Sequence, residues 1–189
     1  IWKCMGVEER MADRCNTIRL YSFQTDVVYQ VLKRDGVCYS KEEYVRKKYK
    51  ESAKVFINAY GWFVKEAQHI VPKPEGAEYP YWAFTDLYNV DQTGDGHVLT
   101  LDVPIGEAIL FDMFDWTKIM QMHYIGENES EEATFSEELK NMGMNEFQIM
   151  TSNFYPEQKA RIQESWKRLF GHQQAIEAGD NSGVHSVQA

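Results

Sequence analysis

The stretch Val98–Trp116, VLTLDVPIGEAILFDMFDW, largely decides the fold class that the sequence predicts. Residues Val98–Val103 alternate apolar and polar side chains, and Ala108–Phe111 form a short apolar run, so both are predicted to be strands. A Pro-Ile-Gly turn separates them, and an aspartate after the second strand can cap a helix. Strands and helices without regular βαβ spacing favour an α+β domain.

The N-terminal half continues this mixture. Ile18–Phe23 alternates and predicts a strand, and the helix that follows it is expected to end at Gly36. A short strand is expected at Val37–Tyr39. The longest helix is predicted to begin at a Ser-x-x-Glu capping box that starts at Ser40, and to carry one apolar face through Ala67.

The C-terminal half is less regular. Residues 126–143 are acid-rich and poorly periodic, so no element is predicted there. A last strand is predicted at Glu146–Met150, and a last helix begins near Pro156 and ends at Gly171. The sequence therefore predicts a single α+β domain with a small split or mixed β-sheet packed by helices.

Length and composition agree with one domain. The chain has 189 residues, of which 43% are apolar and 26% are charged. We expect an N-terminal extension at residues 1–17, the globular domain at 18–171 and a flexible tail at 172–189. No run approaches the roughly 18 uncharged apolar residues of a membrane helix, and the N-terminus lacks the pattern of a secretory signal. A cytoplasmic location without a membrane partner is therefore expected.

Charge is distributed unevenly along the chain. Residues 74–139 contain one lysine and 15 acidic residues, which predicts an acidic surface and a basic protein partner. A basic cluster with interleaved tyrosines occurs at Lys41–Lys54, KEEYVRKKYKESAK. Because glutamates dilute this cluster, the solvated face of an amphipathic helix is the preferred interpretation, and a nucleic-acid partner is not expected.

The segment Asp91–Asp102, DQTGDGHVLTLD, partly matches a calcium-binding loop. A turn before a strand explains the same residues and is the preferred interpretation, so calcium is not expected. The five histidines are too scattered to suggest a metal triad, and no metal site is predicted. Nucleophile-elbow, P-loop and GxGxxG motifs are absent from the sequence.

An acid–aromatic run occurs where the second predicted strand meets the next helix. Asp112, Asp115 and Trp116 lie in it and are candidate ligand-binding residues, because polar groups at strand ends often converge on ligands. In the alternative interpretation, one aspartate is only the helix N-cap and the aromatic residues belong to the core.

Several segments taken together resemble an uncharacterised bacterial family of domains of unknown function, over about residues 18–171. The resemblance implies a cytosolic bacterial protein and supplies no established activity. The segments that carry it are LYSFQ at Leu20–Gln24, AYGWF at Ala59–Phe63, YPYWAF at Tyr79–Phe84, LTLDVPIGEAILFDMFDW at Leu99–Trp116 and ESWKRLF at Glu164–Phe170.

The order of the predicted elements is also similar to the ADP-ribosyltransferase layout, in which a split sheet holds NAD. This resemblance implies catalytic roles for Gln24 on the first strand and Glu146 on a late strand, and ligand contacts from Tyr21, Tyr79 and Trp82. A carboxylate could stabilise an oxocarbenium-like centre while an aromatic ring stacks on nicotinamide. NAD is therefore the cofactor that the resemblance implies.

Two functional hypotheses follow. The first is a ligand-binding domain of unknown activity that takes a small nucleotide-like molecule and carries out NAD-dependent ADP-ribosyl transfer. The second is a non-catalytic acidic module that binds a basic protein. The first depends on one condition, that the tryptophan-bearing loop at Tyr79–Phe84 and the aspartates near Trp116 line the same cavity.

Overall fold

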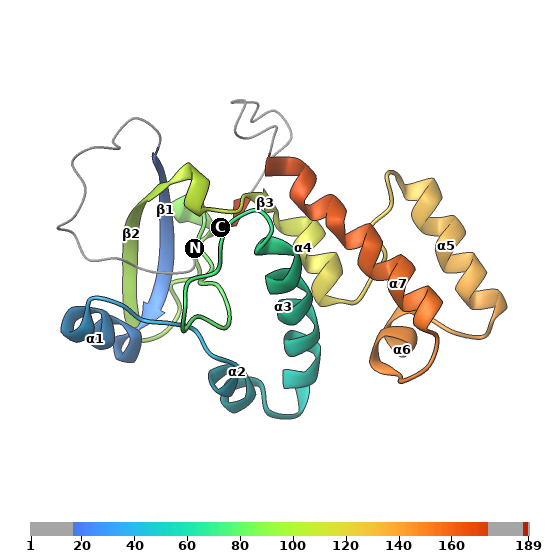
Figure 1. Ribbon diagram of the computed structural model, residues 1–189, viewed down its shortest axis with the longest axis horizontal. Helices are drawn as coiled ribbons and strands as arrows, with labels where there is room; N and C mark the ends of the chain where they lie inside the picture. The colour runs from blue at the N-terminus through green and yellow to red at the C-terminus, as the bar shows by residue number, and fades with distance from the viewer. Residues whose placement is uncertain (1–16, 174–186, 189) are drawn as a thin grey trace.

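Helices and a few short strands are mixed along the chain in the computed structural model, which describes residues 17–173 and 187–188 (Figure 1). The predicted α+β class with a small sheet is confirmed. The elements are β1 (Thr17–Thr25), α1 (Asp26–Asp35), α2 (Glu42–Tyr49), η1 (Lys50–Ser52), α3 (Ala53–Ala67), η2 (Leu87–Asn89), β2 (Gly96–Pro104), η3 (Ile105–Glu107), β3 (Phe111–Asp112), α4 (Met113–Met120), α5 (Glu129–Asn141), α6 (Glu146–Thr151), α7 (Pro156–Ser165), η4 (Trp166–Phe170) and β4 (Val187–Gln188).

The principal β-structure is the antiparallel pair of β1 and β2, in which Leu20 lies opposite Leu101. Alternation along β1 places Leu20 and Ser22 on the buried face of the pair. On its other edge β1 makes one isolated bridge, between Tyr21 and Phe84. A separate short pair is formed by β3 and β4. The predicted first strand and the strand at Val98–Val103 are therefore confirmed.

The larger core surrounds α3. Its buried residues Trp62 and Phe63 pack with Trp116 of α4 and Trp166 of η4, and the rings of Trp62 and Trp166 meet edge to face at 5.2 Å between centroids. Figure 1 shows the β1–β2 pair on one side of α3 and helices α5–α7 on the other. A smaller cluster centred on Leu20 joins β1 and β2 to the segment that follows them.

The predicted long helix is divided into two. Lys50 has φ 49° and ψ −117°, which ends α2, and α3 begins three residues later. The predicted capping box at Ser40 is absent, since Lys41 is the N-cap and the carboxylate of Glu78 accepts from the Glu42 amide. The predicted strand at Val37–Tyr39 is also absent.

The predicted strand at Glu146–Met150 is wrong, because these residues form α6. The Asn145 side chain accepts from the Gln148 amide and the Gln148 side chain accepts from the Asn145 amide, a reciprocal cap that begins a helix. The preceding helix α5 was not predicted. Its N-cap is Asn128, and its buried residues are only Phe135 and Leu139, which is why its periodicity is weak.

Other boundaries also differ from the predictions. The predicted strand at Ala108–Phe111 is reduced to Phe111–Asp112. Helical structure continues past Gly171 to Gln173, so the predicted stop at Gly171 is wrong, whereas Pro156 begins α7 as predicted. The short helix and extension expected at residues 1–16 and most of the expected tail lie outside the described residues.

Candidate functional site

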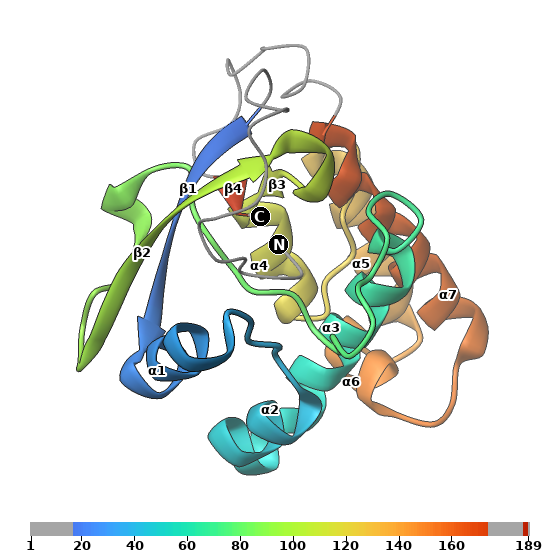
Figure 2. The ribbon, with the colours of Figure 1, turned by 60° about the vertical axis from the view of Figure 1, so that its left-hand side comes forward.

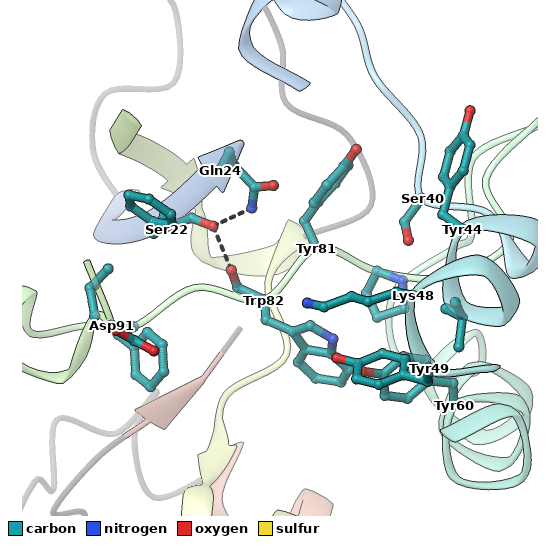
Figure 3. A pocket seen from close by; sticks show the side chains of 15 residues that line it. Ser22, Gln24, Ser40, Tyr44, Lys48, Tyr49, Tyr60, Tyr81, Trp82 and Asp91 are labelled. Carbon is teal, nitrogen blue, oxygen red and sulfur yellow. Dashed lines mark hydrogen bonds between the residues drawn. The ribbon is translucent and has the colours of Figure 1, made fainter. Parts of the chain in front are cut away.

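A pocket of about 360 Å³ lies between the end of β1, helix α2 and the loop that follows α3. The loop segment Tyr79–Phe84 forms one wall of the pocket, and a backbone bridge at each end holds it in place. Tyr79 bridges Ser40 just before α2, and Phe84 bridges Tyr21 of β1. Figure 2 shows the chain running from β1 through α1 to α2, and Figure 3 shows the side chains that line the pocket. The volume is within the range of small-molecule pockets.

A fixed amide group lies at the β1 side of the pocket. The Ser22 hydroxyl is 2.7 Å from the Trp82 carbonyl oxygen and 2.7 Å from Gln24 Nε2. A carbonyl oxygen can only accept, so the single hydroxyl proton goes to Trp82 and Ser22 must accept from the Gln24 NH₂ group. Gln24 Oε1 is therefore turned away from Ser22, toward Tyr81 in Figure 3, and accepts no hydrogen bond from the described residues.

Aromatic rings line the opposite side. The rings of Tyr60 and Trp82 lie 5.5 Å apart, and Tyr49 stacks on Phe56 at 3.6 Å. Burial raises the pKa of Tyr60 to about 12, against a smaller lowering by the Trp82 indole, so its hydroxyl is neutral at physiological pH. These rings give the pocket apolar faces on which a planar group can stack.

The pocket also contains opposite charges that do not pair with each other. Lys48 extends from α2, and its ammonium points toward Trp82 in Figure 3, 5.1 Å from the centroid of the Tyr49 ring. Asp91 lies on the far rim, where its Oδ1 accepts from the Thr93 amide and hydroxyl. The hydrogen bonds from Thr93 lower the pKa of Asp91. A ligand here meets a cation at one end and a carboxylate at the other.

The structure brings only some of the candidate residues together. Gln24 and Trp82 both line the pocket. Tyr79 lies beside it, with its ring 5.3 Å from that of Tyr60 and its hydroxyl donating to Glu42 over 3.1 Å. Burial and this hydrogen bond raise the pKa of Tyr79 to about 12. Tyr21 contributes the backbone bridge and does not line the pocket.

The acid–aromatic run Phe111–Trp116 does not line the pocket and touches its wall through Trp116. Asp112 is buried and is the N-cap of α4, with its Oδ1 accepting from the Phe114 amide over 2.6 Å. Asp115 lies 3.1 Å from His172. Trp116 is also buried, with its ring 4.7 Å from that of Trp82. The loop and the helix therefore meet through two indoles, and the aspartates do not line the pocket. The condition set for the first hypothesis, one cavity lined by both the loop and these aspartates, is not met, so a ligand site has to be argued from the pocket residues alone.

Glu146 lies elsewhere. It begins α6 and lines a separate hollow of about 210 Å³ beside α5. Its Oε2 is 2.5 Å from His123 Nδ1, and its Oε1 accepts from the Tyr124 amide over 3.1 Å. The hydrogen bond that the protonated ring donates to Glu146 raises the pKa of His123. Gln24 and Glu146 thus belong to two different sites.

Several pocket residues were not predicted. Ser22 could have been found, since it is two residues before Gln24 and shares its strand face. Lys48 and Tyr49 belong to the basic segment Lys41–Lys54, for which the sequence pattern favours a solvated helix face. The contribution of Asp91 depends on the path of the loop, which the sequence pattern does not indicate.

The Asp91–Asp102 segment contains a turn followed by β2, as the preferred interpretation predicts. Within residues 17–173, no three His, Cys, Asp or Glu side chains are grouped to hold a metal ion. None of the helices in the described part of the chain combines the length and apolarity needed to cross a bilayer.

Comparison with known proteins gives a family and no activity. A family model described as a domain of unknown function, DUF3841, matches residues 19–189. The predicted resemblance to an uncharacterised domain family is therefore confirmed. No curated protein and no solved structure matches the chain.

Proposed function

Because the chain belongs to the DUF3841 family, whose function is unknown, we propose from the pocket itself that this domain binds a small nucleotide-like molecule. The observation that carries the proposal is the amide of Gln24, whose orientation Ser22 fixes so that Oε1 is available to a ligand. An acceptor held beside aromatic rings suits a planar heterocycle or carboxamide that carries an N–H donor.

The other polar groups of the pocket can contact parts of a nucleotide other than its base. The carboxylate of Asp91 can accept from sugar hydroxyls, as acidic residues do in dinucleotide sites. NAD, which carries both an adenine amino group and a nicotinamide amide, is the cofactor to be tested first. ADP-ribosyl transfer needs a carboxylate beside the ligand, and the carboxylate among the lining residues is Asp91, not Glu146.

Calorimetric titration with NAD, nicotinamide and the four common ribonucleosides tests the proposal. We expect binding by at least one of them and a loss of about tenfold in affinity in Gln24→Leu, which corresponds to one hydrogen bond. Gln24→Ala, which removes the amide without introducing a branched side chain, checks that the loss of affinity does not come from steric conflict with leucine. Gln163→Leu, an exposed glutamine of α7, is the matched control and should bind as the wild type does.

Two results would overturn the proposal: no binding of any probe at millimolar concentration, or equal binding by the wild type and both Gln24 variants. Release of nicotinamide from NAD by the wild type would add transfer or hydrolysis to the function.

The alternative function, binding of a basic protein by the acidic segment, remains a prediction. Many of its carboxylates are used within the chain. Glu132 pairs with Lys118, and Glu138 pairs with Arg161. The pocket is therefore the better-supported site.

A further inference from the structure

Lysines without carboxylate partners concentrate in residues 41–54, and one of them, Lys48, lines the pocket. Most other described cations form ion pairs; the described exceptions outside residues 41–54 are Lys33, Lys73 and Lys159. Lys33 lies over a tyrosine ring, as Lys48 does over Tyr49, and the other two donate to carbonyl oxygens. Within residues 41–54 only Arg46 has a carboxylate partner, Glu42. The lysines of this segment that have none among the described residues are Lys41, Lys47, Lys48, Lys50 and Lys54.

This arrangement is unusual for a chain whose net charge is −9. Lysines at the C-terminal end of α2 stabilise the helix through its dipole, and that alone would account for exposed side chains directed past the helix end. Lys48 instead extends sideways into the pocket (Figure 3), although Asp91 on the opposite rim does not pair with it. Its ammonium is therefore available to a ligand.

We propose that the ligand carries a phosphate group, which binds the ammonium of Lys48 while its base lies beside Gln24 and Trp82. Lys47 and Lys50 neighbour the pocket residues Lys48 and Tyr49 in the chain and add positive potential that attracts the anion. The inference rests on the proposed function and narrows the ligand to a nucleoside phosphate, a class that includes NAD.

The opposite rim indicates a free nucleotide and not a nucleic acid. Residues 74–117 contain no lysine or arginine. Asp91 lies on that rim, and Asp86 and Asp95 belong to the same loop between Phe84 and β2. A polymer that continued past the pocket would meet these carboxylates, and like charges repel. A free nucleotide is short enough for its phosphates to lie near α2 without reaching these carboxylates.

The experiment compares each ribonucleoside with its 5′-mono- and 5′-diphosphate by calorimetry, at low and at high salt. We expect the diphosphate to bind at least about tenfold more tightly than the nucleoside at low salt, and this gain to shrink as salt screens the charges. Lys48→Gln should remove most of the gain, so that this variant binds a nucleoside and its diphosphate with nearly equal affinity. Lys65→Gln, an exposed lysine of α3, is the matched control and should retain the gain.

The outcomes separate this inference from the proposed function. If nucleosides bind and phosphates add nothing, or Lys48→Gln keeps the gain, the phosphate site is wrong while the base pocket stands. If inorganic diphosphate binds through Lys48 but nucleosides contribute nothing, the base pocket is wrong. Single-stranded oligonucleotides whose affinity rises with length would overturn the assignment to a free nucleotide.

Discussion

Gly96 on β2 lies close against the backbone of Gln24 on β1. A Cβ atom at Gly96 would lie 2.5 Å from the Gln24 carbonyl oxygen and 2.5 Å from Phe23 Cζ. The first contact is with backbone, so β1 would have to move away from β2. Gly96→Ala should lower the free energy of unfolding by about 1–3 kcal/mol, as overpacking does.

Urea unfolding measures this effect, and ligand titration should show weaker binding because Gln24 moves with its strand. Gly106→Ala is the matched control, since a Cβ there has nothing within 4 Å. Equal stability of the two variants would show that the close approach of β1 and β2 at Gly96 is wrong.

The pair of His123 and Glu146 makes stability depend on pH. Glu146 raises the pKa of His123 against the lowering effect of burial, and smaller effects come from Glu132, which raises it, and Lys118, which lowers it. Because the pKa is higher in the folded state, the stabilisation is complete below the ordinary histidine value of about 6.5 and is lost as pH rises through the folded value.

Glu146→Gln should therefore bring the pKa of His123 back toward its ordinary value, as followed by NMR of the ring protons. Its stability deficit should be larger at about pH 6 than at about pH 9. The variant keeps an acceptor for the Tyr124 amide, which isolates the charge. The signal of His69 serves as the internal reference; an unchanged His123 titration would contradict the pairing.

At the scale of elements, the junction between α2 and α3 is strained. Lys50 has φ 49° and ψ −117°, a conformation that a side chain disfavours and glycine adopts readily. Lys50→Gly should raise the free energy of unfolding by a few tenths to about 1 kcal/mol, whereas Lys47→Gly, inside α2, should lower it by about 0.5–1 kcal/mol. Thermal unfolding of both variants tests this; a loss of stability in Lys50→Gly would contradict it.

Elements whose signals are local could be predicted, and those specified by tertiary contacts could not. Alternation along β1 and the left-handed Gly36 after α1 are visible in the sequence. In α6 the signal was the pair of side chains that form its cap, which the apolar pattern of Glu146–Met150 obscured. For α2, a carboxylate 36 residues away at Glu78 satisfies the Glu42 amide in place of a local cap.

The same distinction applies to the site. Gln24 and Trp82 could be proposed from sequence, and the structure places both in one pocket. Their neighbours Lys48 and Asp91 come from a helix and a loop that only the bridges at Tyr79 and Phe84 bring alongside β1. Bridges between distant segments leave no periodic signal, so the sequence did not indicate the complete pocket.

At the scale of the whole molecule, the end of the described main segment is tied to its middle. Gln173 is buried, and its Oε1 accepts from the Leu110 amide over 2.7 Å. Its Nε2 lies 3.5 Å from the Ala108 carbonyl oxygen. Leu110 and Ala108 are fully buried, so the Leu110 amide would have no water in place of Gln173.

Gln173→Ala should therefore lower the free energy of unfolding by about 1–3 kcal/mol, the cost of an unsatisfied buried amide together with lost packing. Gln173→Leu keeps much of the side-chain volume and should be destabilised as well, because the loss arises from the missing acceptor. Gln163→Ala, exposed on α7, should change stability by less than about 0.5 kcal/mol. Urea unfolding of the three variants decides whether residue 173 belongs to the cooperative unit; if both Gln173 variants unfold with the wild type, it does not.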